Sequence, residues 1–254
     1  AAETIFGGAG ADWITGGGPL DGDELHGNGG ADIFRGGGTE FVNDVIRGGG
    51  GHDTLLNTGG ADLSLGAKTA SWTGLERIDA AGFAVLAHGS EALDLTGMRL
   101  VNATGILANA ATTSLTGSDS ADHIVGAANA QTLDGGLGAD VISGGAQGDT
   151  FVYDALSDSG RGHGTDRILD MTVGVDLIDL SGIDAVAGGA DDAFTWIGNA
   201  AFSGTAGELR LKQIGTGPDW YLRGDVDGDA VWDLSIRLDG LGPGTAFGAS
   251  DLVL

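Results

Sequence analysis

A nine-residue motif recurs along the chain and constrains what it can fold into. Four copies follow the pattern G-G-x-G-x-D-x-U-x, where U is a large apolar residue, except that Asn28 takes the second glycine position. They occupy residues 7–15, 27–35, 48–56 and 135–143. Glycine permits positive φ and close backbone approach, whereas the x-U-x end is typical of a short strand with its apolar residue turned inward. One copy cannot bury that residue alone, so the repeats predict stacked turns of a parallel β-solenoid.

The spacing of the acidic positions predicts how these turns stack. In the first block the positions advance in steps of 11, 9, 12, 9 and 9, through Asp12, Asp23, Asp32, Asp44, Asp53 and Asp62. Two nonapeptides make one turn, so the extra residues at 16–22 and 36–43 are expected on the same side of the solenoid. A second block keeps the nonapeptide step throughout, through Asp122, Gln131, Asp140 and Asp149. Gln131 replaces an acid there, and we expect it to weaken that site.

The acidic residues of the chain point to a hard cation as the ligand of these loops. The chain has 36 acidic and 11 basic residues, a formal net charge of −25, and 30 of its acids are aspartate. Aspartate is favoured in tight turns and as a short-armed ligand of Ca²⁺, which takes about six to eight oxygens. One loop cannot supply that many oxygens, but two stacked loops can. The sequence therefore predicts several Ca²⁺ ions between successive loops, held in part by the aspartates of the two blocks.

Residues 66–115 lack the motif but keep an apolar rhythm close to two nonapeptides. One ladder, with steps of 17, 20, 18 and 18, runs through Ile78, Leu95, Leu115, Leu133 and Phe151. Another, with steps of 21, 17 and 18, runs through Leu86, Leu107, Ile124 and Ile142. We expect the solenoid to continue here without metal loops; the alternative is a separate β insert with coincidental leucine spacing. The expected all-β organisation is a first repeat block over 1–65, motif-free turns over 66–115, a second block over 116–152 and a C-terminal region over 153–254.

The C-terminal region abandons the nonapeptide and reads as a compact β cap on the open end of the solenoid. Short strands are expected around 194–197, 208–212, 220–223 and 231–238. Between the last two, GDVDGDAVWD places acids at steps of two, two and four residues, at Asp225, Asp227, Asp229 and Asp233. Alternate acids on a glycine-containing loop resemble the start of an EF-hand-type Ca²⁺ loop, although the terminal glutamate is missing. The alternative is an acidic hairpin turn.

Several classes of function are disfavoured by composition and motif. Eleven scattered basic residues in this acid excess provide no basic face for nucleic acid or for an anionic membrane. The longest apolar run, 80–87, is too short to span a bilayer, and no cleavable secretory signal is visible. Cysteine is absent, so folding cannot depend on disulfides. The five histidines are isolated and none is followed by glutamate, so we expect no HExxH zinc site and no catalytic centre in this chain.

The repeats and the C-terminal segments together resemble RTX proteins, especially the C-terminal region of serralysin-type metalloproteases. The segments that carry the second resemblance are DRILDMTVGVDLIDLSGIDA, FTWIG, FSGTAGELR and the final DLVL. The resemblance implies a parallel β-roll with Ca²⁺ between successive loops. It also implies export by type I (ABC) secretion machinery, which reads an uncleaved C-terminal signal, here the cap and its DLVL tail. The long motif-free stretch departs from the compact roll of the family.

The resemblance further implies which atoms hold the ions. By motif position, four backbone carbonyls of each nonapeptide join its aspartate carboxylate as ligands. These carbonyls belong to Gly7, Gly8, Ala9 and Gly10, to Gly27, Asn28, Gly29 and Gly30, to Gly48, Gly49, Gly50 and Gly51, and to Gly135, Gly136, Leu137 and Gly138.

Three functions remain open on the sequence. The first is a Ca²⁺-binding module that stays unfolded in a low-Ca²⁺ cytosol, because its carboxylates repel one another, and that folds outside the cell when Ca²⁺ binds. The second is a Ca²⁺-dependent, self-assembling part of a surface-layer protein or adhesin. The third is the non-catalytic tail of a secreted protease, lipase or glycan-modifying enzyme. Residues 3–6 fit the end of an earlier nonapeptide, so we expect Ala1 to be a boundary within a longer protein that has an upstream domain.

Overall fold

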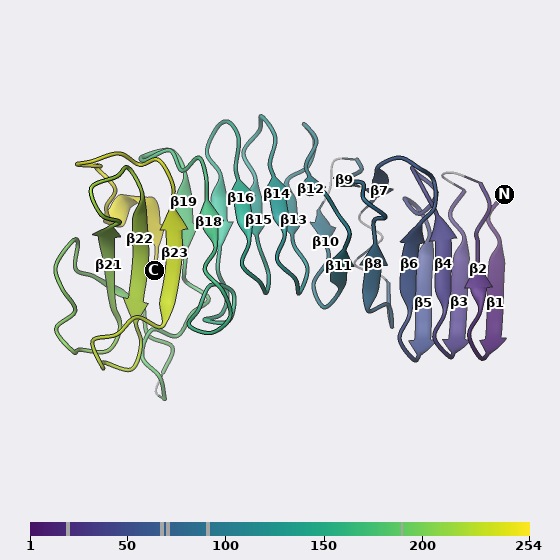
Figure 1. Ribbon diagram of the computed structural model, residues 1–254, viewed down its shortest axis with the longest axis horizontal. Helices are drawn as coiled ribbons and strands as arrows, with labels where there is room; N and C mark the ends of the chain where they lie inside the picture. The colour runs from purple at the N-terminus through teal and green to yellow at the C-terminus, as the bar shows by residue number, and fades with distance from the viewer. Residues whose placement is uncertain (19–20, 67–68, 70–71, 90–91, 189) are drawn as a thin grey trace. The chain divides into compact units, whose positions relative to one another are not determined.

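The computed structural model is built from short strands joined by tight turns, in two compact units, Ala1–His123 and Ile124–Leu254 (Figure 1). It describes residues 1–18, 21–66, 69, 72–89, 92–188 and 190–254. In both units most strands pair in parallel with strands that lie one turn of chain away. The expected fold class, an all-β parallel β-solenoid, is confirmed. Among the described residues no helix is long and apolar enough to cross a membrane.

The first repeat block forms two parallel sheets that face each other. One sheet holds β1 (Thr4–Ala9), β3 (Glu24–Gly29) and β5 (Val45–Gly50), and the other begins with β2 (Trp13–Ile14), β4 (Ile33–Gly36) and β6 (Thr54–Asn57). The apolar residue of each nonapeptide, Ile14, Phe34 or Leu55, is buried. In Figure 1 the tight nonapeptide turns lie at one end of these strands and the longer loops at the other. The two insertions therefore lie on the same side, as the aspartate spacing predicts.

Parallel pairing continues from the end of the first block through the motif-free stretch, and the described residues there form three short strands per turn. The strands are β7 (Leu63–Leu65), β8 (Arg77–Asp79), β9 (Val85–Ala87), β10 (Leu93–Asp94), β11 (Arg99–Val101), β12 (Ile106–Leu107) and β13 (Ser114–Thr116). They form three sheets, in which β8 and β11 follow β6, β9 and β12 follow β7, and β13 follows β10. The chain between register partners is therefore longer than two nonapeptides, as in Ile78↔Leu100, Val85↔Ile106 and Leu93↔Leu115.

This longer turn corrects one apolar ladder expected from the sequence. Leu115 pairs with Leu93 and not with Leu95, and Ile78 belongs to another sheet, opposite Leu55 and Leu100. The rhythm of two nonapeptides does not apply where a third strand lengthens each turn. The expected pairing of Leu86 with Leu107 is confirmed, although the inward-facing residues of those strands are Val85 and Ile106.

The second unit continues with two parallel sheets and ends in an antiparallel meander. β14 (His123–Val125) spans the boundary between the units. One sheet holds β15 (Thr132–Asp134), β17 (Thr150–Val152), β19 (Leu177–Asp179) and β24 (Leu252–Val253). The other holds β16 (Val141–Ser143), β18 (Arg167–Ile168), β23 (Leu234–Leu238), β22 (Trp220–Asp225), β21 (Glu208–Gln213) and β20 (Thr195–Trp196). The four strands expected in the cap are all present, and the DLVL tail forms the last strand.

Candidate metal centre

Carboxylates of successive turns are joined to the backbone in a repeating relay. The N–H of Asp12 donates to Oδ1 of Asp32 (2.8 Å), and the N–H of Asp32 donates to Oδ1 of Asp53 (2.8 Å). Asp53 continues the relay to Oε2 of Glu76 (2.7 Å). On the opposite side, Glu3 donates to Asp23 (2.7 Å) and Asp23 to Asp44 (2.8 Å). One oxygen of each accepting aspartate, Asp23, Asp32, Asp44 or Asp53, is thus used to hold the register between turns.

The second oxygen of these carboxylates is buried and has no protein partner. Among the described residues this holds for Oδ2 of Asp12, Asp23, Asp32 and Asp53. Buried carboxylate oxygens without a hydrogen bond or counter-charge are costly, and the groups then either take up a proton or bind a cation. Each loop therefore presents a hard, anionic oxygen in the protein interior, which is the donor that Ca²⁺ prefers.

The first glycine of the motif makes room for that oxygen. A Cβ added at Gly7 would lie 2.7 Å from Oδ2 of Asp12, and one at Gly144 would lie 2.6 Å from Oδ2 of Asp149. Gly27, Gly48 and Gly135 stand in the same relation to the aspartate five residues later. The glycine and the aspartate thus form one structural unit, in which the loop closes over the carboxylate.

The second motif position shows why Asn28 is tolerated. Asn28 has a φ of +74°, in the left-handed region. The glycines at the same motif position, Gly8 and Gly49, have φ of +121° and +104°. Asparagine enters this region more readily than other non-glycine residues. The departure from the motif therefore leaves the loop geometry intact.

Three carboxylates converge on the side of the longer loops. Ligand oxygens of Asp21, Asp23 and Asp44 all lie within 4.8 Å of one another. Burial and the charges of Asp23, Asp21 and Glu40 raise the pKa of Asp44 to about 6. The sequence analysis did not include Asp21 in the predicted site, because it lies in the inserted loop outside the nonapeptide. The Asp-Gly-Asp sequence at 21–23 was the local signal that could have identified it.

In the second unit the relay crosses longer connections. Asp140 N–H donates to Oδ1 of Asp166 (2.8 Å), and Asp149 N–H donates to Oδ1 of Asp176 (2.9 Å). The N–H of Gly174 donates to Oδ1 of Asp251 (2.6 Å), next to the C-terminal strand. Asp166, Asp176 and Asp251 were missed because the connections that lead to them are longer than two nonapeptides and hide the repeat.

Gln131 fills the slot of an aspartate with a neutral side chain. Its Oε1 accepts the N–H of Ala127 (2.6 Å), and a Cβ added at Gly126 would lie 2.7 Å from it. Its own N–H donates to Oδ1 of Asp149 (2.9 Å), as an aspartate would. The relay is therefore kept without the anionic charge, and a weaker site at this position stays a prediction.

Among the described residues, some of the other predicted site residues lie outside clusters of three carboxylates and some within one. Asp62 is exposed and accepts the N–H of Ala84 (3.0 Å), whereas Asp122 is buried and accepts the N–H of Ser118 (2.7 Å). Asp225, Asp227 and Asp229 do converge, with oxygens within 4.8 Å of one another on the β22–β23 loop. Asp233 is not part of that group and accepts the N–H of Val226 (2.8 Å).

The buried carboxylates predict that, without metal, the folded state is more stable at acidic pH than at neutral pH. Burial is the main cause that raises the pKa of Asp44 and Asp149 to about 6 and that of Asp166 to about 7, from 3.8. The stability these groups contribute is present below pH 4 and is lost as the pH rises through about 6 to 7. In chelator, the β-sheet circular dichroism signal is expected to increase as the pH is lowered from about 8 to about 5. With saturating Ca²⁺ the trend should reverse, because the ion needs deprotonated carboxylates. A metal-free stability that rises with pH would contradict this.

Comparisons with known proteins give one family and two similar solved structures. The family model described as "Peptidase M10 serralysin C terminal" matches residues 1–254. No curated protein matches the chain. Among solved structures, two repeat subunits of the Azotobacter vinelandii mannuronan C5-epimerase are similar. The AlgE6R3 subunit is 22% identical, with 68% of this chain and 79% of that chain covered and a TM-score of 0.40. The AlgE6R2 subunit is 23% identical, with 67% and 92% covered and a TM-score of 0.41.

The architecture and the family match together define a class of protein. It is a repeat-built β-solenoid of the kind found in RTX proteins, with acidic residues in its loops. The chain belongs to the serralysin C-terminal family, which is the non-catalytic C-terminal repeat region of secreted proteins.

Proposed function

We propose that this chain is a Ca²⁺-binding module that folds outside the cell and directs the export of a larger secreted protein. One observation carries the proposal: the relay aspartates hold the turns together with one oxygen and leave the other buried without a partner. Apolar packing alone does not offset a row of such charges, because each carries a desolvation cost. A divalent cation between the loops offsets that cost and joins neighbouring turns.

The proposed ligands are the loop carbonyls and carboxylates of facing nonapeptides. These are the carbonyls of 7–10, 27–30, 48–51 and 135–138 together with Asp12, Asp32, Asp53 and Asp140. On the opposite side, Asp21 joins Asp23 and Asp44 in the proposed set, because their oxygens converge. The loop of Asp225, Asp227 and Asp229 is a further proposed site. Asp225 has both oxygens engaged, with the N–H groups of Gly228 and Ala230, so the two exposed aspartates would supply most of its charge.

Ca²⁺ binding would couple folding to location. A chain of net charge −25 repels itself when metal-free, so folding waits for the cation. Extracellular Ca²⁺ modules bind with dissociation constants of about 10⁻⁴–10⁻³ M, far above cytosolic Ca²⁺. Because the folded state binds the ion and the unfolded state does not, binding free energy becomes folding free energy. The module would stay unfolded until it leaves the cell.

The C-terminal segment supports a link between folding and export. β24 pairs in parallel with β19, Leu252 is buried, and Asp251 is fully buried beside it. A type I export machinery that reads the DLVL tail would therefore meet it only in the unfolded chain. In this proposal low cytosolic Ca²⁺ keeps the signal accessible, and external Ca²⁺ buries it after export.

Asp32 provides a specific test, because it lies between the loops of Asp12 and Asp53. Asp32→Asn keeps an oxygen that can accept the Asp12 N–H and removes the charge, whereas Asp32→Ala removes both. We expect Asp32→Asn to raise the Ca²⁺ midpoint for folding about threefold or more, since affinity follows ligand charge, and Asp32→Ala to raise it further. Circular dichroism during a Ca²⁺ titration measures both shifts.

The matched control is Asp94→Asn. Asp94 is half-buried on β10 and accepts the N–H of Thr96 (2.9 Å), at a distance from the nonapeptide loops along the chain. The Ca²⁺ midpoint for folding of this variant is expected to stay at the wild-type value. An unchanged midpoint in both Asp32 variants would show that the proposed stacking of metal loops is wrong.

A further inference from the structure

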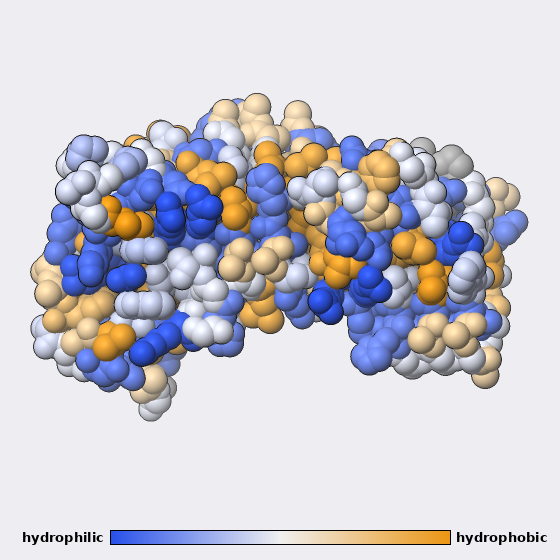
Figure 2. Space-filling model, viewed as in Figure 1, coloured by the Kyte–Doolittle hydropathy of each residue, from blue (hydrophilic) through white to orange (hydrophobic). Residues whose placement is uncertain are grey.

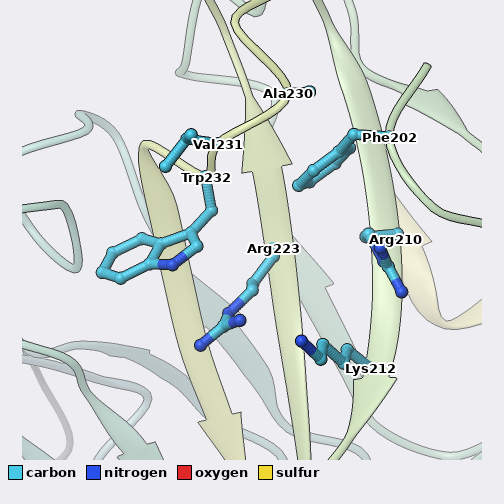
Figure 3. Close-up of a pocket in the computed structure, with 7 residues that line it drawn as sticks. All are labelled: Phe202, Arg210, Lys212, Arg223, Ala230, Val231 and Trp232. Atoms are coloured by element: carbon cyan, nitrogen blue, oxygen red, sulfur yellow. The ribbon is translucent and has the colours of Figure 1, made fainter. Parts of the chain in front are cut away.

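The cap contains a concentration of positive charge that stands out in so acidic a chain. Three of the 11 basic residues, Arg210, Lys212 and Arg223, line one cavity of about 280 Å³ on β21 and β22. Its other walls are Phe202 and the 230–232 segment, and none of the lining residues is acidic. Figure 3 shows Arg223 beside Trp232, Arg210 below Phe202 on the neighbouring strand, and Lys212 further along that strand. Figure 2 shows strongly hydrophilic side chains over these strands.

The antiparallel register forces two of these cations together. Arg210 and Arg223 are direct cross-strand partners, a pairing of like charges that destabilises a sheet. Lys212 lies two residues further along β21, opposite Tyr221, on the same face. The cap therefore bears an unfavourable arrangement of charge at this point.

No carboxylate of the described residues lies within ion-pair distance of these three cations. Other arginines of the chain do find acids: Arg77 pairs with Asp79, Arg167 with Asp239, and Arg237 with Asp219 and Asp239. The Nε atoms of Arg210 and Arg223, like those of Arg35 and Arg167, are buried and lack a hydrogen-bond partner among the described residues. In a chain with 36 acids, three such cations in one cavity leave a place for an external anion.

Aromatic rings lie close to the two guanidinium groups. Arg223 lies over Tyr221 (4.3 Å to the ring centroid) and over Trp232 (5.1 Å), and Arg210 lies over Phe202 (5.4 Å). A stacked guanidinium keeps its N–H edge available and presents the paired donors that match a carboxylate. Trp232 and the exposed Val231 add an apolar wall, and the cavity has room for a single six-membered ring.

We propose that this cavity binds a small ligand that carries a carboxylate on a ring. The carboxylate pairs with Arg210 and Arg223, Lys212 adds to the positive potential that attracts the anion, and the ring packs against Trp232. The acid can belong to a sugar ring or to an aromatic ring, since both present the same group. The site is distinct from the nonapeptide loops, but its 230–232 wall continues the loop of Asp225, Asp227 and Asp229: the N–H groups of Ala230 and Val231 donate to Asp225 and Asp229. The test is therefore made in saturating Ca²⁺.

The test uses the full chain in saturating Ca²⁺ and follows the arginine Nε–H signals by NMR. Glucuronate and benzoate are the charged probes, and glucose and benzyl alcohol are the neutral ones. We expect the signals of Arg210 and Arg223 to shift with one or both acids and not with the neutral rings. The acid that binds more tightly identifies the ring type. Absence of shifts with both acids would overturn the proposal, as would equal binding of the neutral rings or of sulfate.

Arg210→Gln separates a binding role from a structural one. Binding is expected to weaken about tenfold to a hundredfold, because a charge-assisted hydrogen bond is lost. The melting temperature without ligand should stay unchanged or rise, because the repulsion from Arg223 is relieved. Arg77→Gln, at an arginine paired with Asp79, is the control and should bind normally. Loss of stability in Arg210→Gln with unchanged binding would show that these cations serve the fold alone.

Discussion

Removal of Ca²⁺ from the full chain is expected to convert its far-UV circular dichroism spectrum from β-sheet to that of an unfolded chain. The buried second oxygens of Asp12, Asp32 and Asp53 follow one another along one side of the solenoid, and without a cation each keeps its desolvation cost. Returning Ca²⁺ should restore the β signal cooperatively, with a midpoint at about 10⁻⁴–10⁻³ M. Cooperativity is expected because each turn is stable only when its neighbours are formed.

Two controls identify the cause of this transition. Mg²⁺ should fail to replace Ca²⁺, because it demands a tight octahedral shell and gives up water reluctantly, whereas these loops offer many backbone and carboxylate oxygens. NaCl at about 0.5 M screens exposed charges and should not replace Ca²⁺ if the cation fills specific sites. A β spectrum that survives chelator would mean that the apolar ladders through Phe34 and Leu55 hold the fold alone. Refolding in NaCl alone would reduce the role of Ca²⁺ to charge screening.

The parts of the fold that repeat locally could be predicted from the sequence. The buried Ile14, Phe34, Leu55 and Ile142 occupy the apolar position of the four nonapeptides, so a nine-residue window contains their signal. In the motif-free stretch, the sequence pattern predicted the class of fold correctly but not the register between strands. Leu93 and Leu95 are both buried, and only the three-strand turn decides that Leu93 faces Leu115.

The candidate sites were predictable to the same extent. Motif aspartates were found, but Asp21, Asp166 and Asp176 lie in or after connections of irregular length, where the period gives no guide. The basic cavity carried no sequence signal at all. Arg210 and Arg223 belong to different strands, and a hairpin register that cannot be read from composition makes them neighbours.

Gly27→Ala is expected to abolish or severely weaken the metal-bound fold. The added Cβ would collide with Oδ2 of Asp32 and with the backbone carbonyl oxygen of Gly48 in the next turn. The carbonyl cannot move without shifting the neighbouring nonapeptide, and the carboxylate oxygen is the proposed ligand. We expect a loss of about 2–4 kcal/mol of folding free energy, typical of severe overpacking, together with a raised Ca²⁺ midpoint. Chemical denaturation at fixed Ca²⁺ measures the first and a Ca²⁺ titration the second.

Gly29→Ala, two residues away in the same loop, is the matched control. A Cβ there meets no heavy atom within 4 Å, and Gly29 is not among the residues with positive φ. Its register partner in the preceding turn is already an alanine, Ala9. This variant should change the folding free energy by no more than about 0.5 kcal/mol. Comparison of the two Gly→Ala variants therefore separates the effect of the clash at Gly27 from the general effect of losing a glycine. Equal effects of the two variants would refute a specific role for the Gly27–Asp32 unit, because only Gly27 lies against the carboxylate.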